Sequence, residues 1–201
     1  MKVAVIGGGS TYTPELINGF LERVDSFPLR ELWLMDSSQE RLDVVGRFAQ
    51  SMVQAKKAPF AVHLTTDQRE AVAEANYVTT QLRVGGMPAR REDEYLGLRH
   101  GLIGQETTGI GGMAKALRTI PVILQIAADM QELAPGALLV NFTNPAGLVT
   151  EALFRYAPQV PAVGVCNAPI HMKMDILADL EKQMGQPIDS ARANLDTLGL
   201  N

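Results

Sequence analysis

The stretch that most constrains the fold of this chain is its first fourteen residues. The apolar run Lys2–Ile6 does not alternate with polar residues, which is typical of a strand buried on both faces. Three glycines follow at once, and Pro14 then stands where the first turn of a helix tolerates proline, with Thr13 as the expected N-cap. Such a break leaves backbone N–H groups unpaired at the positive end of the helix dipole, where they form an anion site suited to pyrophosphate.

This strand–glycine–helix pattern predicts a dinucleotide-binding loop. The residues expected to contact the cofactor there are Gly7, Gly8, Gly9, Ser10 and Thr11. The pattern is imperfect, because Tyr12 occupies the position of the third glycine of the usual fingerprint.

A second cofactor contact is expected at the end of the short strand Glu31–Met35. Asp36 follows it, and a carboxylate there can accept hydrogen bonds from ribose hydroxyls and repel a 2′-phosphate, so NAD is favoured over NADP. Asp36 comes 27 residues after Gly9, which is farther than the usual spacing of about 20. Arg41 is a further candidate contact, and its charge weakens the argument against a 2′-phosphate.

The rest of the chain alternates strands and helices with short connections. Further strands are predicted at 60–64, 77–82, 137–142 and 162–165, and helices at 39–54, 68–74, 114–133, 146–156 and 170–184; a last strand is expected at 195–201. Pro121 predicts a kink or a start within the helix 114–133. The glycine-rich stretch 97–112 is interpreted as a long functional loop. The alternation predicts an α/β fold with a doubly wound parallel sheet and right-handed crossovers.

In such a sheet, the loops after the strands line the ligand crevice. Arg83, in the loop that follows the fourth strand, is a candidate cofactor contact, with a flexible turn as the alternative. Arg90 lies just past this loop, and its guanidinium can hold a phosphate with two hydrogen bonds, with a solvated helix face as the alternative. Asn144 precedes a proline that pushes it out of the helical region, so its amide can face the crevice, unless it forms an ordinary turn. Cys166 follows the sixth strand as a candidate metal ligand, with a buried apolar thiol as the alternative.

The composition argues against several classes of function. The chain has 201 residues and a net charge of −4, with no footprint for nucleic acid or an anionic membrane. No stretch approaches the roughly 20 apolar residues that span a bilayer, and the first residues lack the pattern of a signal peptide, so none is expected. The single cysteine excludes an internal disulfide, and a cytoplasmic location is expected. Serine-hydrolase, zincin and P-loop motifs are absent.

Four motifs carry a family resemblance: 7–12 (Gly-Gly-Gly-Ser-Thr-Tyr), 104–109 (Gly-Gln-Glu-Thr-Thr-Gly), 141–145 (Asn-Phe-Thr-Asn-Pro) and 166–169 (Cys-Asn-Ala-Pro). In this order they resemble glycoside hydrolase family 4, in its 6-phospho-β-glucosidase branch, whose members hydrolyse without the usual pair of carboxylates. The resemblance implies that NAD⁺ takes hydride from C3 of a phosphosugar, a base removes the C2 proton, and the aglycone leaves C1. Water then adds and the hydride returns, with a divalent metal such as Mn²⁺ stabilising the charge.

The resemblance also implies roles for individual residues. Cys166 matches the thiolate metal ligand, and Arg90 and Asn144 match residues that hold the phosphosugar. Glu106 fits the substrate pocket of the β branch. Asn167 stands where the α branch has aspartate, so it is assigned to substrate binding and is the candidate catalytic residue within the chain.

The chain departs from the family at its end. The second metal-ligating histidine is expected just after Asn201, and the tyrosine base farther on. The resemblance therefore implies an NAD-binding Rossmann domain at 1–169 and the start of a truncated substrate domain at 170–201. This polypeptide is expected to be inactive alone, and the full-length protein to be a homo-oligomer. An NAD-dependent 2-hydroxy acid dehydrogenase and a non-catalytic NAD-binding module are the alternatives.

Overall fold

The structure, a computed structural model, describes residues 1–196. It divides the chain into two compact units, of which the first is Met1–Gly164 and the second begins at Val165. The predicted domain boundary at 169/170 stays a prediction. The strand expected at 195–201 falls almost wholly outside the described residues.

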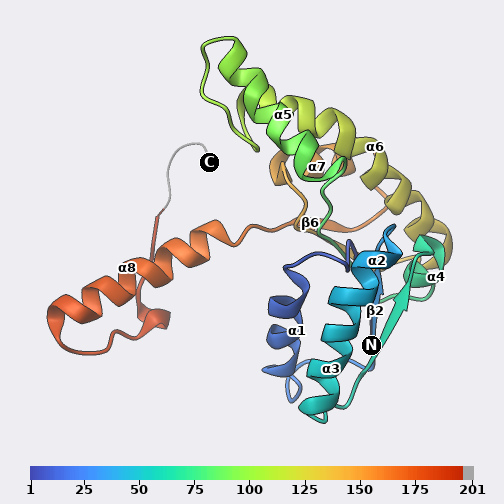
Figure 1. Ribbon diagram of the computed structural model, residues 1–201. Helices are drawn as coiled ribbons and strands as arrows, with labels where there is room; N and C mark the ends of the chain where they lie inside the picture. The colour runs from blue at the N-terminus through green and yellow to red at the C-terminus, as the bar shows by residue number, and fades with distance from the viewer. Residues whose placement is uncertain (197–201) are drawn as a thin grey trace. The chain divides into compact units, whose positions relative to one another are not determined.

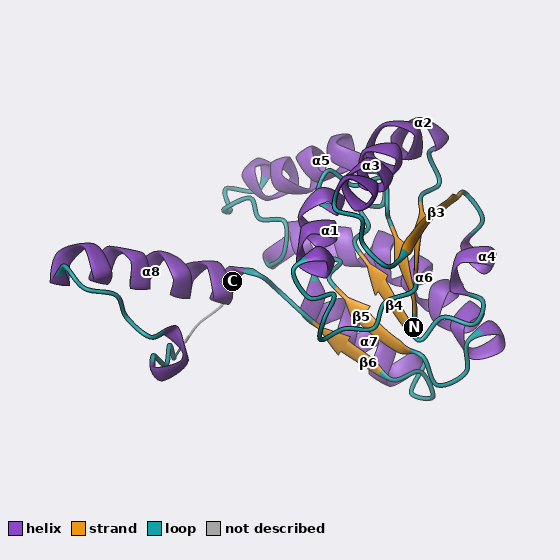
Figure 2. Ribbon diagram, turned by 90° about the horizontal axis from the view of Figure 1, so that it is seen from below, coloured by secondary structure: helices purple, strands orange, loops and turns teal. Residues whose placement is uncertain are grey.

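The first unit contains a six-stranded parallel sheet in the order β3-β2-β1-β4-β5-β6 (Figure 2). This is the strand order of dinucleotide-binding folds, and it confirms the predicted fold class. The strands are β1 (Lys2–Ile6), β2 (Glu31–Met35), β3 (Ala61–Thr65), β4 (Tyr77–Thr80), β5 (Leu138–Asn141) and β6 (Ala162–Gly164).

Helices cover both faces of this sheet (Figure 1). One face packs against α1 (Thr13–Leu21), the π-helical turn η1 (Leu42–Gly46) and α3 (Arg47–Ala55), and the short helix α2 (Gln39–Arg41) leads into η1. The other packs against α4 (Gln68–Val72), α6 (Gly109–Leu133) and α7 (Ala146–Tyr156), and α5 (Gly86–Arg99) packs on α6. Val3 and Val5 of β1 enter the first core, and Ala4 and Ile6 enter the second. Because both faces are buried, the strand has no polar alternation.

Two local predictions are wrong, and a third is wrong in part. Tyr12, not Thr13, is the N-cap of α1, and it makes no side-chain cap bond. The glycine-rich loop is confined to residues 100–108, because α5 extends to Arg99 and α6 begins at Gly109. Of the kink or start predicted at Pro121, the start is wrong, because helix α6 continues through the proline. The kink stays a prediction.

Helix α6 corrects one further expectation. By its length of 25 residues and its apolar composition, α6 could span a membrane, although the sequence analysis expected no stretch of this kind. However, 44% of its most apolar stretch is buried inside the protein. Its Ile123, Ile126 and Met130 lie in the sheet core, which explains the apolar composition without a bilayer.

The second unit contains α8 (Ala168–Met184) and the 3₁₀ turn η2 (Ser190–Arg192). Gly185 ends α8 in the left-handed conformation, with φ of 67°, as a C-terminal glycine commonly does. Glu181 accepts a hydrogen bond from the backbone N–H of Ile188 at 2.8 Å, and Lys173 donates to the carbonyl of Ser190 at 2.8 Å. These two bonds hold the segment after α8 against the helix.

Candidate functional site

The glycine loop after β1 packs against the end of β2. The Asp36 carboxylate accepts hydrogen bonds from the backbone N–H of Gly9 at 3.1 Å and from that of Ser38 at 3.0 Å. A Cβ on Gly9 would lie 2.6 Å from Arg41 Cβ and 2.8 Å from Asp36 Oδ2, so the close approach requires glycine. The structure therefore brings together three of the predicted cofactor contacts, Gly9, Asp36 and Arg41.

The amides of this loop are more occupied than the sequence suggested. Gly7 and Gly8 both donate to the carbonyl of Met35, at 2.8 and 2.7 Å, and Ser10 donates to Gly7 at 3.0 Å. The expectation of unpaired amides in this loop therefore fails for the three glycines. Within residues 1–196, the amide of Thr11 has no hydrogen-bond partner. A pyrophosphate at the start of α1 would be bound mainly by this amide and by the positive end of the helix dipole.

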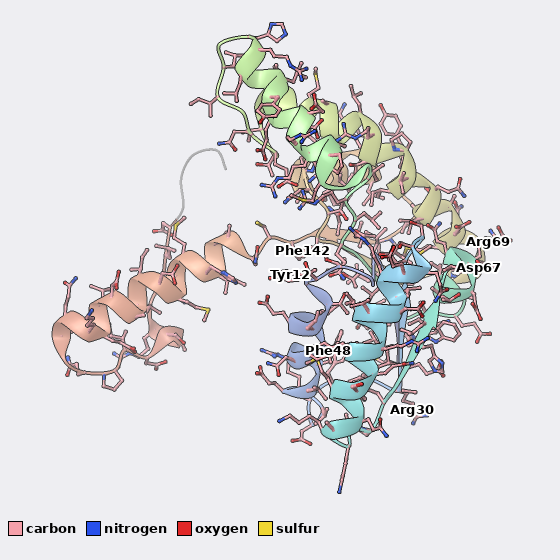
Figure 3. All side chains as sticks on the ribbon, viewed as in Figure 1. Tyr12, Arg30, Phe48, Asp67, Arg69 and Phe142 are labelled. Carbon is pink, nitrogen blue, oxygen red and sulfur yellow. The ribbon has the colours of Figure 1, made fainter. Side chains whose placement is uncertain are left out.

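Tyr12, which replaces the third glycine, faces the loop that follows β5. Its ring centroid lies 5.2 Å from that of Phe142, with the planes tilted by 38° (Figure 3). The next residue, Thr13, donates a hydrogen bond to the carbonyl of Gly8 at 2.8 Å. A side chain at position 12 is thus accommodated at the edge of the glycine loop.

The loop after β4 joins three parts of the site through three consecutive residues. The side-chain amide of Gln81 donates to the carbonyl of Gly7 at 3.0 Å and to Thr13 Oγ1 at 2.8 Å. The backbone N–H of Leu82 donates to Thr143 Oγ1 at 2.9 Å. Arg83 forms an ion pair with Glu106. This single loop fixes the glycine loop, the turn after β5 and the loop 100–108 relative to one another.

A buried polar link aligns β4 with β5. Thr80 Oγ1 donates to Asn141 Oδ1 at 2.9 Å, and the backbone N–H of Thr143 donates to the same oxygen at 3.2 Å. Asn141 Nδ2 donates to the carbonyl of Thr143 at 3.1 Å. This link positions Asn144, which is half-buried, precedes a cis proline peptide bond and makes no hydrogen bond within residues 1–196. Its phosphosugar role stays a prediction.

The charged part of the site is a cluster around Glu106, which we call the Glu106 cluster. Glu106 Oε1 accepts hydrogen bonds from Lys115 and Arg83, and Glu106 Oε2 lies 3.5 Å from Arg90 Nε. Arg90 also pairs with Glu94 at 2.8 Å. Three cations therefore face two carboxylates, which leaves excess positive charge for an anionic ligand.

The pKa values of the central pair follow from burial and these charges. Burial by itself would raise the pKa of Glu106, but the hydrogen bond from Lys115 and the charges of the three cations together hold it below the ordinary value. Burial lowers the pKa of Lys115, and the Glu106 carboxylate opposes that shift. The Lys115 side chain is only 3% exposed, so the pair is an ammonium–carboxylate contact largely removed from water.

Two features of the chain bring Glu106 onto Lys115. A Cβ on Gly111 would lie 2.3 Å from the carbonyl oxygen of Gln105, so the loop before α6 can only lie this close to its first turn because position 111 is glycine. Asp93 of α5 and Arg118 of α6 form a two-point ion pair at 2.5 and 2.8 Å, with Asp93 buried. This pair joins the two helices that carry Arg90 and Lys115.

Lys115, Asp93 and Arg118 were missed by the sequence reasoning. The sequence contains one indication of the role of Lys115. It stands four residues before Thr119 and eight before Ile123, which places it at helical spacing on the buried face of α6. A lysine at an otherwise apolar helical position indicates a buried partner. For Asp93 and Arg118 no comparable pattern exists, since charged residues surround Asp93 on α5.

The described residues do not form a metal site. Cys166 is exposed and unbonded, and residues 1–196 contain no group of three His, Cys, Asp or Glu side chains that could hold a metal ion. A thiolate alone does not meet the coordination that Mn²⁺ or zinc needs. Asn167 takes the N-cap position of α8. The metal role of Cys166 and the substrate and catalytic roles of Asn167 stay predictions.

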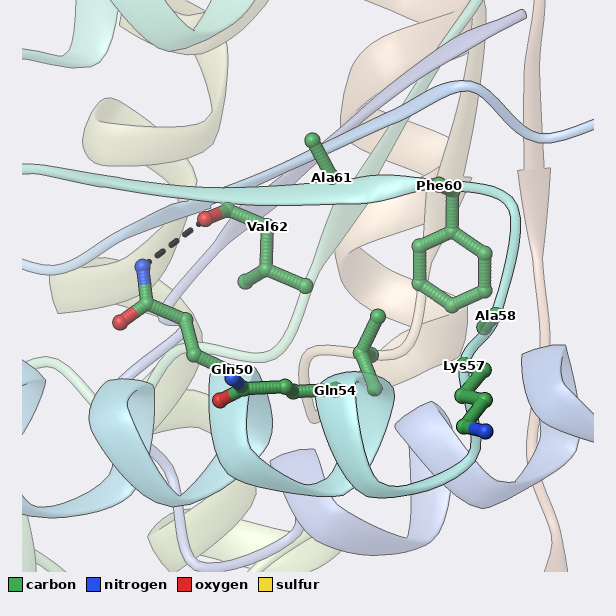
Figure 4. Close-up of a pocket in the computed structure, with 8 residues that line it drawn as sticks. Gln50, Gln54, Lys57, Ala58, Phe60, Ala61 and Val62 are labelled. Atoms are coloured by element: carbon green, nitrogen blue, oxygen red, sulfur yellow. Dashed lines mark hydrogen bonds between the residues drawn. The ribbon is translucent and has the colours of Figure 1, made fainter.

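A separate hollow of about 560 Å³ lies beside the edge strand β3 (Figure 4). Its lining residues are Gln50, Val53, Gln54, Lys57, Ala58, Phe60, Ala61 and Val62. It opens at the start of β3, whereas the predicted site residues follow the carboxyl ends of the strands. One lysine is its only charged lining side chain, so nothing in it matches the predicted chemistry.

The fold is a Rossmann-like α/β domain, and comparison with known proteins identifies the family. The profile of "Family 4 glycosyl hydrolase" matches residues 2–182, and the chain belongs to that family. The resemblance inferred from the four motifs is confirmed.

Individual relatives sharpen this assignment. The chain is 51% identical to the "Probable 6-phospho-beta-glucosidase" of Bacillus subtilis and 48% identical to the "6-phospho-beta-glucosidase" of Escherichia coli, over the whole chain in each case. It spans 45% and 44% of their lengths, so less than half of each relative is matched.

Solved structures agree with the sequence comparison. The 6-phospho-beta glucosidase of Thermotoga maritima, solved with manganese, NAD⁺ and glucose-6-phosphate, matches with a TM-score of 0.82 at 36% identity, over 92% of this chain and 45% of that one. Lactate dehydrogenase from Eimeria maxima matches with a TM-score of 0.53 at 11% identity, over 82% of this chain and 43% of that one, and it shows the fold alone.

Proposed function

We propose that the protein to which this chain belongs hydrolyses 6-phospho-β-glucosides in an NAD-dependent reaction. The observation that carries the proposal is the loop Gln81–Arg83, which ties a cofactor-type glycine loop to a cluster with excess positive charge. A redox cofactor and a phosphorylated sugar need these two features side by side. The names of the relatives that are 51% and 48% identical support the β-linked substrate.

The residues divide the work as follows. The loop at Gly7–Thr11 and Asp36 would bind NAD, and the close packing of Gly9 against Asp36, which only a glycine allows, fits this assignment. Bound NAD⁺ would supply the hydride acceptor for the sugar. Arg90, Asn144 and Asn167 would hold the phosphosugar, and Glu106 would accept a hydrogen bond from a sugar hydroxyl. No step is assigned to a metal, because the described residues do not supply its ligands.

The test is the release of nitrophenolate from p-nitrophenyl 6-phospho-β-glucoside by the protein at its full encoded length. We expect release to require added NAD⁺ without net formation of NADH, because the hydride returns to the product. We also expect it to require the 6-phosphate, and to be lost on chelation of divalent metal. Turnover in D₂O should place deuterium at C2 of the product.

Each other outcome identifies a different protein. Net NADH formation from a 2-hydroxy acid, unaffected by a chelator, would identify a dehydrogenase. NAD binding without turnover of any phosphoglucoside would identify a non-catalytic module. Faster cleavage of the α-anomer would exclude the β-linked substrate while retaining the family chemistry.

A further inference from the structure

Lys115 is the most buried charged side chain of the Glu106 cluster. It is 3% exposed, whereas Arg83 and Arg90 are 34% and 36% exposed. Burying an ammonium is costly, and a sequence retains one where a specific partner needs it. The family resemblance gives Lys115 no role, and its partner is Glu106, a predicted substrate contact.

The two oxygens of Glu106 have different surroundings. Oε1 accepts hydrogen bonds from the Lys115 ammonium and from Arg83. Oε2 has only the 3.5 Å ion pair with Arg90 among residues 1–196. Lys115 and Arg83 therefore fix one oxygen, and the other retains lone pairs for a further donor.

Helix α6 makes this anchor rigid. Lys115 lies in its first two turns, which the Asp93–Arg118 pair joins to α5. Gly111 lets residues 105–108 lie directly on those turns. The ammonium thus reaches Glu106 from a well-packed helix, whereas Arg83 reaches it from a loop.

We propose that Lys115 is a positioning residue, which anchors Glu106 through Oε1 and presents Oε2 to a hydroxyl group of the phosphosugar. It does not touch the sugar itself. The proposal rests on the proposed function for the identity of the ligand, but its effect on Glu106 is independent of any ligand. The charged groups that face Glu106 are Arg83 from the β4 loop, Arg90 from α5 and Lys115 from α6, and Glu94 of α5 pairs with Arg90.

The test compares Lys115→Met with Lys115→Arg, and uses Lys56→Met as the matched control. Lys56 is exposed and its side chain makes no hydrogen bond within residues 1–196. In the protein at its full encoded length, we measure the dissociation constant for glucose 6-phosphate and the carboxyl ¹³C titration of Glu106, assigned with Glu106→Gln. The melting temperature is recorded separately.

For Lys115→Met we expect binding of glucose 6-phosphate to weaken on the order of tenfold, the lower end for loss of an orienting partner. The titration of Glu106 should move to higher pH, because burial remains and one cation is gone. The factor by which Lys115→Met weakens binding should change with pH. We take the ratio of the variant and wild-type dissociation constants at each pH, because the phosphate group of glucose 6-phosphate titrates in the same way for both proteins. Lys115→Arg should restore most of the affinity, and Lys56→Met should change nothing.

A lower melting temperature with unchanged binding and an unchanged Glu106 titration would overturn the proposal, since Lys115 would then be merely structural. If Lys115→Met fails to fold, Lys115→Gln, which keeps a donor and removes the charge, decides by the same two measurements. If the wild-type protein does not bind glucose 6-phosphate, the proposed substrate fails. The titration of Glu106 still decides whether Lys115 controls that carboxylate.

Discussion

The two sides of the candidate site are built from different interactions. On the glycine-loop side, the chain is fixed within the sheet mostly by neutral hydrogen bonds from backbone groups, Gln81 and Thr13, with the Asp36 carboxylate as a charged acceptor. On the other side, the Glu106 cluster consists of charged groups held by α5, α6, the loop between them and the loop after β4. The first side is defined mainly by the shape of the backbone, and the second by an excess of positive charge.

This difference has an energetic consequence. A neutral hydrogen bond that is lost costs about 1 kcal/mol, whereas an uncompensated buried charge costs several. We therefore expect the charged side to depend most strongly on individual side chains. The glycine-loop side should instead respond most strongly to added volume.

The largest effect is expected for Arg118→Met. It leaves the buried Asp93 carboxylate without its cation, and such a loss typically costs about 3–5 kcal/mol. Because Arg118 is 33% exposed, water relieves part of this cost, and we expect about 2–3 kcal/mol. Urea unfolding measures it. Arg155→Met, which removes an exposed pair with Glu151 at 2.6 Å, is the control and should cost less than about 0.5 kcal/mol. Equal losses would show that the α5–α6 pair is no stronger than a surface pair.

The next effect is expected for Gly9→Ala on the opposite side. The added methyl group would meet Arg41 and Asp36 at under 3 Å, and such overpacking costs about 1–3 kcal/mol. Since Gly9 lies in the cofactor loop, NAD⁺ binding should weaken on the order of tenfold or more. Titration of NAD⁺ by fluorescence measures this.

The matched control is Gly147→Ala in α7, where a Cβ would meet nothing within 4 Å. There alanine should stabilise the helix by about 0.5–1 kcal/mol and leave NAD⁺ binding unchanged. If Gly9→Ala binds NAD⁺ as tightly as the wild-type protein does, the assignment of NAD⁺ binding to this loop is wrong.

A smaller effect is expected for Thr80→Val, which keeps the shape of the side chain and removes its hydroxyl group. Asn141 Oδ1 loses the 2.9 Å bond from Thr80 but keeps the one from Thr143. The expected loss in unfolding free energy is therefore about 1 kcal/mol. Thr79→Val is the control on the same strand, because Thr79 is only half-buried and makes no side-chain hydrogen bond within residues 1–196. A loss as large as that of Arg118→Met would contradict the contrast between the two sides.

The sequence predicted the glycine-loop side better than the charged side, and the reason is physical. Strand β1 and its glycines form a local signal, and six apolar strands with helices between them leave few alternative sheets. Helix α5 was missed because its buried residues are Asp93 and Gly97, so it has no apolar face whose period could be detected.

Tertiary contacts also decided how the predicted residues group together. Arg83 was assigned to the cofactor, but the structure pairs it with Glu106, a predicted substrate residue. That contact joins residues 23 positions apart through the fold of a loop. No pattern of apolar spacing encodes it, because loop positions have no fixed period. The roles of both residues in binding stay predictions.

The smallest expected effect concerns pH and the Glu106 cluster itself. Because the pKa of folded Glu106 lies below the ordinary 4.5, folding favours its ionised form. The stabilising contribution is complete above about pH 5.5 and is lost as the pH falls through the folded pKa. The gap in unfolding free energy between wild type and Glu106→Gln should thus be constant near neutrality and narrow below pH 4.5.

The shift is modest, because the burial that strengthens the ion pairs also opposes ionisation. Denaturant unfolding at a series of pH values measures it. The control is Glu40→Gln, which removes an exposed carboxylate that has no ion pair within residues 1–196. If the difference in unfolding free energy between wild type and Glu106→Gln instead widens in acid, the effect of burial on the pKa of Glu106 outweighs that of the three cations. Glu106 would then be protonated more easily, and the cluster would carry still more positive charge for an anion.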